Sequence, residues 1–208
     1  MNRSCRNLAL VFLLVLLCCC ERNPTSLEGT CLDGDCMNGK GSWIHPTGDK
    51  YEGHWKNGEF HGQGTWIMSN GQVYVGEFER GWAHGDGTMT WPNGSKYVGQ
   101  FKRWKKNGKG TQYFPDGAVY VGQFKNGKME GEATVTSADG KRFIGQYKDN
   151  KPNGFGSYLF PDGGKYEGQF KNGKFEGEGV MVYPDGRKIV GRWKNNILIE
   201  TYTKEDST

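Results

Sequence analysis

The stretch Tyr166–Lys188, YEGQFKNGKFEGEGVMVYPDGRK, contains the signals that decide the fold. It is one copy of a pattern that returns every 23 residues without insertion or deletion. The first positions of the copies are Tyr51, Tyr74, Tyr97, Tyr120, Phe143, Tyr166 and Ile189. A fixed period of this length predicts a repeat array, in which one small unit is stacked many times and presents a long surface rather than a pocket.

Each unit is predicted to form two short antiparallel strands and two turns. Tyr166 and Phe170 lie at alternate positions, which points them to one face of a strand. Asn172-Gly173 favours a type I′ hairpin turn, because both central residues of that turn need positive φ. The later Pro-Asp-Gly at 184–186 predicts the second turn, since proline presets φ and glycine accepts a positive φ.

The glycines of the unit have a predicted place opposite one another. A two-residue turn is expected to set Gly168 opposite Gly177, and Tyr166 opposite Gly179. Glycine inside a strand is unfavourable unless space is needed. We therefore expect the aromatic rings to cover these glycines, and a β-branched residue at Gly177 to collide with the rings.

These patterns predict an all-β fold, an elongated and twisted meander of β-hairpins in a single-layer sheet. About seven repeats, or about fourteen strands, are expected, because no unit buries its aromatics alone. The 34 glycines and the 13% aromatic content agree with a core made of rings. The structural aromatics are predicted to be Tyr51, Tyr74, Tyr97, Tyr120, Phe143 and Tyr166.

The N-terminus has the features of an export signal. Arg3 and Arg6 precede an apolar run from Leu8 to Leu17, which is shorter than the about 20 residues that a membrane-spanning helix needs. The expected organisation is a signal peptide at 1–19, a tether at 20–30, the repeat array at 31–203 and a polar tail at 204–208. Without Arg3 and Arg6, 27 − 2 = 25 basic residues face 23 acidic ones, so nucleic acid is not an expected partner.

The cysteines after the apolar run resemble the cleavage region of bacterial lipoproteins. That family has Leu three residues before a lipid-modified cysteine, and Leu16 and Leu17 hold that place before Cys19 and Cys20. The residue just before each is Cys rather than the usual Gly, Ala or Ser. The resemblance implies lipidation of Cys19 or Cys20 and a membrane-anchored protein of the bacterial cell envelope. The alternative is an ordinary cleaved signal and a secreted protein.

Cys31 and Cys36 remain beyond the signal. In an exported chain they are expected to form a disulfide that staples the first hairpin. A metal site is the weaker alternative, because two cysteines alone lack a complete ligand set.

The units Tyr51-Glu52-Gly53, Tyr74-Val75-Gly76 and Tyr166-Glu167-Gly168, each with a later Gly-x-Gly, resemble MORN repeats (membrane occupation and recognition nexus). The resemblance covers about residues 31–200. It implies an extended meander of hairpins and a role in protein interaction, scaffolding or membrane attachment. In relatives whose repeats are fused to an enzyme, the catalytic part lies outside the repeats. Here the only segments expected outside the array are the signal, the tether and the tail, which leave no room for such an enzyme.

Three surfaces are candidates for binding. The first is a row of aromatic residues on the second strands, which either binds a peptide strand or glycan, or packs against its neighbours. Its members are Trp66, Trp91, Phe114, Phe160 and Tyr183.

The second candidate is the row of hairpin tips with their lysines. It either contacts anionic lipid headgroups or consists of solvated turns. One tip differs, because Trp104 takes the turn-glycine position in Arg103-Trp104-Lys105-Lys106. An exposed Trp among cations is expected to be a binding hot spot, and its replacement by Ala to weaken a partner without unfolding the array.

The third candidate is a weak metal site. His54, His61 and His84 recur on neighbouring strands, and exposed polar positions explain them equally well.

The sequence therefore favours a non-enzymatic, membrane-anchored scaffold that binds an unidentified protein at the cell envelope, without a cofactor. The alternative is a glycan- or cell-wall-binding module that uses the aromatic residues. No Ser-His-Asp set, phosphate loop or paired acids point to an enzyme.

Overall fold

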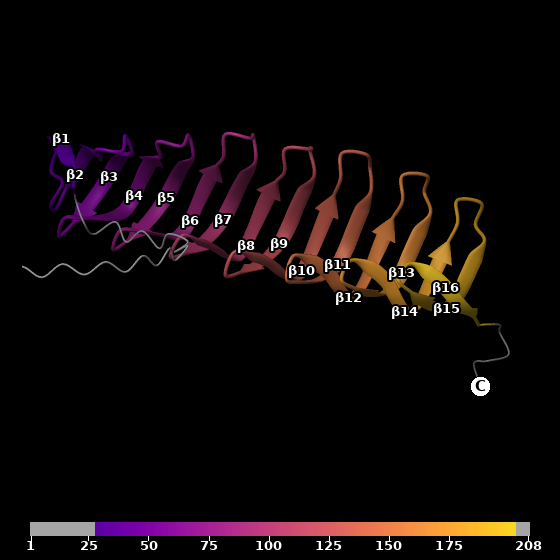
Figure 1. The fold of residues 1–208 in the computed structure, drawn as a ribbon. Coiled ribbons are helices and arrows are strands. Elements are labelled where there is room, and N and C mark those ends of the chain that lie inside the picture. The colour runs from indigo at the N-terminus through magenta and orange to yellow at the C-terminus, as the bar shows by residue number, and fades with distance from the viewer. Residues whose placement is uncertain (1–27, 203–208) are drawn as a thin grey trace, which may run out of the picture.

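A single antiparallel sheet makes up the fold. The computed structural model describes residues 28–202, and this part of the chain forms sixteen strands and no helix. Every strand pairs with its neighbours in sequence, in the order β1 to β16. Figure 1 shows them following one another along an elongated sheet, with turns along both long edges. The predicted all-β meander is confirmed. The expected fourteen strands become sixteen, because both incomplete end repeats form whole hairpins.

The strands alternate between a first and a second strand of each hairpin. The first strands are β1 (Thr30–Gly34), β3 (Lys50–Lys56), β5 (Val73–Glu79), β7 (Lys96–Lys102), β9 (Val119–Lys125), β11 (Arg142–Lys148), β13 (Lys165–Lys171) and β15 (Lys188–Lys194). The second strands are β2 (Lys40–Ile44), β4 (Glu59–Ile67), β6 (Trp82–Thr90), β8 (Lys105–Tyr113), β10 (Lys128–Thr136), β12 (Lys151–Leu159), β14 (Lys174–Val182) and β16 (Ile197–Thr201).

Both turns of the repeat have the conformations that their sequences predict. Asn172 and Gly173 have φ values of 52° and 82°, as a type I′ turn requires. At the other end of the unit, Gly186 has a φ of 86° and the backbone N–H of Arg187 donates to Asp185 Oδ1 at 3.0 Å. The local turn signals therefore set the hairpins.

The predicted register within the hairpin is wrong beyond the first pairs. Phe170 faces Phe175 as expected from the turn, but Gly168 faces Gly179 rather than Gly177. Tyr166 faces Met181 rather than Gly179. A β-bulge causes the shift, because the three residues 176–178 of β14 lie opposite the single residue Gln169 of β13.

The role predicted for Gly177 is also wrong. Gly177 has a φ of 65°, and a Cβ at this position would collide with Gln169 Oε1, not with an aromatic ring. The glycines that lie under a ring are Gly168 and Gly179. A Cβ added to Gly168 would lie 2.7 Å from Tyr166 Oη, and a Cβ added to Gly179 would lie 2.5 Å from Tyr166 Cζ. Rings do cover paired glycines, but a different pair from the one expected.

The tyrosines at the first position of the repeat form the centre of the core. Their relative exposures are 0% or 1%, and the residues are Tyr51, Tyr74, Tyr97, Tyr120 and Tyr166. Each hydroxyl donates to the backbone carbonyl three residues later, as from Tyr120 Oη to Gln123 O at 2.7 Å. That carbonyl lies beside the bulge, so the hydroxyl satisfies a polar group that the bulge disturbs. We call this side of the sheet the aromatic face and the other side the opposite face.

The aromatic face is concave across the width of the sheet. The ring centroids of Phe60 and Trp66 are 5.3 Å apart. The two residues are six positions apart on β4, a separation of about 20 Å in a straight strand. The bulge at Gly62, which has a φ of 58°, lies between them and accounts for the bend. The bulge is repeated in the complete hairpins, and we call the concave surface between the two rows of turns the groove.

No helix in residues 28–202 has the length and apolar character that crossing a membrane requires. The predicted signal peptide, the lipidation candidates Cys19 and Cys20, and the predicted tail lie outside the described residues.

Candidate functional site

Two clefts interrupt the aromatic face. The cleft nearer the N-terminus has a volume of about 940 Å³ and receives side chains from both rows of turns. Met68, Ser69 and Asn70 come from one row, and Arg103 and Trp104 come from the other. The cleft is therefore a part of the groove that side chains from both edges of the sheet border.

Trp104 folds over this groove, so its ring is not exposed as we expected, and its role as a binding hot spot stays a prediction. Its ring is half-buried and meets Trp66 edge-on at a centroid distance of 5.0 Å, with Tyr74 at 5.3 Å. Trp104 has a φ of 64° in the turn position that glycine or asparagine holds elsewhere. Ala83 is fully buried, and its small side chain leaves space for the Trp104 ring. The backbone carbonyl of Ala83 accepts a hydrogen bond from the backbone N–H of Trp104 at 3.1 Å. Arg103 and Lys105 stay exposed at the tip.

Lys106 also points inward, although its sequence context predicts a tip lysine. Its Nζ lies 4.9 Å from the ring centroid of Trp91 and 5.2 Å from that of Tyr97, and it donates to Gln112 Oε1. Gln112 is buried and donates from Nε2 to the carbonyl of Tyr113 at 2.9 Å. Burial lowers the pKa of Lys106 to about 8. The Lys106 ammonium group and the Gln112 amide therefore lie among aromatic rings in the middle of the array, where cation–π contacts stabilise the charge.

Of the aromatic residues predicted on the second strands, only Trp66 lies on a strand, and the other four begin the turns that follow. All five are neither fully exposed nor fully buried. Trp91, Phe114 and Phe160 are half-buried and pack against the core rings, and Tyr183 lies beneath the guanidinium of Arg187 at 5.0 Å. Trp66 is packed in the same way, and its Nε1 is buried without a hydrogen-bond partner. These rings form the wall of the groove and keep part of their surface open to a ligand.

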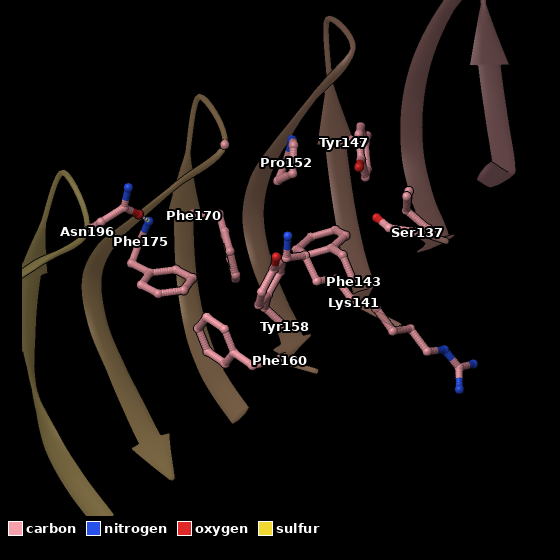
Figure 2. A pocket seen from close by; sticks show the side chains of 13 residues that line it. Ser137, Lys141, Phe143, Tyr147, Pro152, Tyr158, Phe160, Phe170, Phe175 and Asn196 are labelled. Atoms are coloured by element: carbon pink, nitrogen blue, oxygen red, sulfur yellow. Dashed lines mark hydrogen bonds between the residues drawn. The ribbon is translucent and has the colours of Figure 1, made fainter. Parts of the chain in front are cut away.

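The second cleft, with a volume of about 430 Å³, lies in the C-terminal half of the aromatic face. Figure 2 shows its labelled rings around a common space, with the hairpin-tip residues Pro152 and Asn196 at one side and Ser137 at the other. Tyr158, Phe160 and Phe175 meet at interplanar angles of 67° to 83°. The rings stand edge-to-face, the arrangement that aromatic quadrupoles favour.

The opposite face carries an exposed apolar row along the sheet axis. Each member has a relative exposure of 41% to 51%, and the members are Val75, Val98, Val121, Ile144 and Val190. Because side chains alternate between faces, the last residue of each first strand points the same way. Those residues include Lys56, Lys102, Lys125, Lys148, Lys171 and Lys194. This face therefore combines apolar surface with charges of both signs, because Glu52, Glu79 and Glu167 hold equivalent positions in other repeats.

The remaining predicted residues lie away from both clefts. Cys31 and Cys36 are joined by a disulfide with a Cα–Cα distance of 6.1 Å. His54 faces His61 across the first complete hairpin, while His84 Nδ1 lies 3.4 Å from Glu79 Oε2. Within residues 28–202, no group of three or more His, Cys, Asp or Glu side chains is placed to hold a metal ion. The three histidines are not gathered into one site.

The family model for the MORN repeat matches six consecutive segments, 51–73, 74–96, 97–119, 120–142, 143–165 and 166–186. This chain belongs to the MORN-repeat family. The MORN match covers more than half of the chain and agrees with the hairpin boundaries seen in the structure. MORN repeats are a non-enzymatic repeat family. A comparison with curated proteins finds none that matches the chain.

Solved structures resemble the MORN array only in general arrangement. The TCP domain of Drosophila melanogaster SAS-4, solved in complex with a proline-rich motif of Ana2, has 12% identity and a TM-score of 0.49 over 81% of this chain and 92% of that chain. The TCP10 domain of Danio rerio CPAP has 14% identity and a TM-score of 0.31 over 79% and 89%. With identities this low and TM-scores below 0.5, these structures say nothing about what this chain binds.

Sequence reasoning missed the inward placement of Lys106 and the cleft beside Ser137. Both features can be found by comparing the residues that hold the same position in different repeats. Lys106 takes the position of Phe60, Met129 and Phe175, and Ser137 takes the position of Phe114 and Phe160.

Proposed function

We propose that this MORN-repeat chain is a non-enzymatic scaffold that binds a protein partner in the groove of its aromatic face. The observation that carries the proposal is the pair of clefts, about 940 Å³ and 430 Å³, lined by half-buried rings on one concave surface. Aromatic-lined concavities of this size are typical of binding sites, and aromatic residues dominate the energetics of protein interfaces. A sheet that is paired throughout its length supplies a rigid support for them.

A photo-crosslinking experiment tests this proposal. The full chain would carry a photoreactive p-benzoylphenylalanine at Asn70, in the larger cleft, or at Val121, on the opposite face. We expect one specific polypeptide adduct from Asn70 in native cells and none from Val121. Protein adducts that form from Val121 alone would contradict a partner in the groove.

We further propose that the chain is exported and held at the membrane of a bacterial cell envelope by lipid on Cys19 or Cys20. The support is the basic and apolar N-terminal sequence and the position of Leu16 and Leu17. Detergent phase separation of the full chain tests it. We expect the chain in the detergent phase, and a variant with both cysteines changed to Ala in the aqueous phase. Recovery of the unaltered chain in the aqueous phase would favour the secreted alternative.

A second candidate function is contact of the opposite face with an anionic membrane surface. Exposed Val and Ile side chains lie between strand ends that carry lysines, and each lysine near such a surface contributes about 1 kcal/mol. Vesicles of phosphatidylcholine with and without phosphatidylserine separate the possibilities. Binding that needs phosphatidylserine and falls with Lys125→Glu and Lys148→Glu, neither of which lines a cleft, supports membrane contact, and binding unchanged by these substitutions contradicts it.

The glycan alternative has weaker support. Sugars stack on flat, open ring faces, whereas the rings of the smaller cleft stand edge-to-face and half-buried. Retention of the full chain on insoluble cell-wall material, lost on replacement of Trp91 and Phe160, would favour glycan binding over a protein partner.

A further inference from the structure

One charged side chain interrupts the apolar interior of the aromatic face. Lys106 holds a second-strand position whose side chain points onto this face, and the residue at the same position is uncharged in every other hairpin from β3–β4 onward. The uncharged equivalents are Phe60, Ala83, Met129, Pro152, Phe175 and Leu198. The fold therefore does not require a cation at this position, because apolar side chains fill it in the other repeats.

The charge of Lys106 is held at a cost to the fold. Its Nζ lies near the ring centroids of Trp91, Tyr97 and Phe124, at 4.9 Å, 5.2 Å and 5.8 Å. These contacts offset only part of the lost hydration, because burial lowers the pKa of Lys106 to about 8. A residue that lowers stability where an apolar one would serve is typical of a functional site.

The array satisfies only part of the hydrogen-bonding capacity of the ammonium group. An ammonium group has three N–H donors, and among the described residues only the Gln112 side chain accepts one from Lys106. Gln112 Nε2 donates to the backbone carbonyls of Lys96 at 3.2 Å and Tyr113 at 2.9 Å, which keeps its Oε1 directed at Lys106. Within residues 28–202 Lys106 forms no ion pair. The cation is therefore held in place without an anion beside it.

Lys106 lies next to the larger cleft. Trp104 and Lys105, which precede it on the same hairpin, line that cleft, and so does Asn126 on the next tip. The two hairpins are joined at this point, because the backbone N–H of Gly127 donates to the Lys106 carbonyl at 2.8 Å. The Lys106 side chain is half-buried rather than enclosed. A polypeptide bound in the larger cleft would therefore lie beside Lys106.

We propose that Lys106 anchors the partner of the groove by binding a carboxylate of that partner beside the larger cleft. The proposal rests on the function proposed above and names the chemical group that the groove recognises. A carboxylate carries the opposite charge and accepts the N–H groups that Gln112 leaves free. The rings around the ammonium group lower the local dielectric constant and strengthen the attraction. A partner without the acid would leave a desolvated cation unpaired, so the contact also selects the partner.

A crosslink without a spacer tests the contact. Carbodiimide joins an amine directly to a carboxylate, and it is applied to native cells that contain the full chain. Mass spectrometry then identifies the peptides attached to Lys106. We expect Lys106 to be joined to a carboxylate of the same polypeptide that the photo-crosslink at Asn70 captures. The attached residue distinguishes an Asp or Glu side chain from a C-terminal carboxylate, and either one supports the proposal.

Matched variants separate charge from packing. The double substitution Lys106→Met with Gln112→Val introduces the residues that hold these positions in the next repeat, so the variant is expected to fold with equal or greater stability. We expect its photo-adduct from Asn70 to fall at least about tenfold, as the loss of a desolvated charge pair does. Lys125→Met removes a tip lysine that lines neither cleft, and it is expected to leave the adduct within about twofold.

The outcomes separate this inference from the function on which it rests. The inference is overturned if the double variant forms the Asn70 adduct in full yield, or if carbodiimide joins Lys106 to no carboxylate of the captured polypeptide. In both cases the Asn70 adduct of the unaltered chain still supports a protein partner in the groove. Absence of that adduct from the unaltered chain would contradict both proposals.

Discussion

At the scale of single residues, paired glycines set how closely the tyrosine rings approach the sheet. Gly168 and Gly179 face each other, and the ring of Tyr166 covers both. Within the six complete repeats, residues 51–186, the pairing has one exception, because Ala133 faces Gly122 under Tyr120 and is still buried. The array therefore accommodates one methyl group at this position, but the contacts leave no room for a branched side chain.

Gly179→Val is expected to destabilise the array by about 3 kcal/mol, because the added methyls overpack against Tyr166. Chemical unfolding of the full chain measures the change. Ala133→Gly is the control and is expected to alter the stability by less than about 1 kcal/mol, since it reproduces the glycine pair of the other repeats. An unfolding midpoint of Gly179→Val equal to that of the unaltered chain would contradict this account of the glycines.

Lys106 makes stability depend on pH. Its folded-state pKa of about 8 lies below the ordinary value of 10.5, so between these values the unfolded chain binds the proton more strongly than the folded chain does. This residue therefore destabilises the fold below pH 8, and the penalty is relieved as the pH rises from 8 towards 10.5.

The double substitution Lys106→Met with Gln112→Val copies Met129 and Val135 of the next repeat. We expect it to stabilise the chain at pH 7 by about 1 kcal/mol, a value reduced for the partial solvent access of Nζ. Thermal unfolding at pH 7 and pH 9.5 is the measurement. The variant should lose the rise in stability between these pH values, and an equally steep rise would assign it to other groups.

At the scale of elements, the bulged hairpin explains what the sequence predicts and what it does not. Asn172-Gly173 predicts the turn, because its φ requirements are local, and the alternation of Tyr166 and Phe170 predicts the buried face. The bulge escapes prediction, because Gly177 reads as an ordinary strand glycine until the pairing with Gln169 is known. The smaller cleft could not be predicted for the same reason, because the residues that surround Ser137 are known only once the strand register is known.

Trp104 shows the same limit on one hairpin tip. Its turn position predicts the positive φ but not that the ring folds back over Trp66 and Tyr74. Trp104→Asn keeps a residue suited to the turn, as Asn150 and Asn196 are, and removes the ring. We expect a loss of about 2 kcal/mol in unfolding free energy, because lost packing outweighs the relief of backbone strain. A stability equal to that of the unaltered chain would restore the view of Trp104 as a free surface residue.

At the scale of the whole molecule, the buried tyrosines limit stability at high pH. Burial raises the pKa of Tyr97 and Tyr166 to about 12 and raises those of Tyr51, Tyr74 and Tyr120 further above the ordinary value of 10. Above pH 10 the unfolded chain releases these protons and the folded chain retains them, so stability is lost as pH rises from 10 to 12.

We therefore expect the chain to unfold cooperatively between pH 10 and 12, with tyrosinate absorbance appearing together with the loss of sheet signal in circular dichroism. Tyr166→Phe removes one ionising group and one hydrogen bond, as Phe143 does naturally. It should shift the alkaline midpoint upward while lowering stability at pH 7 by about 1 kcal/mol. Tyrosinate absorbance that appears before the sheet signal is lost would show that the hydroxyls ionise within the fold.

The pairing of every strand with only its neighbours in sequence has a mechanical consequence. Tension applied between the two ends of the array loads the terminal strands first, and each strand that detaches leaves the next one at the edge. Yielding should then proceed from the ends in steps, each releasing one 23-residue repeat, or roughly 75 Å of chain. Under load such a molecule lengthens gradually while its remaining repeats keep their shape.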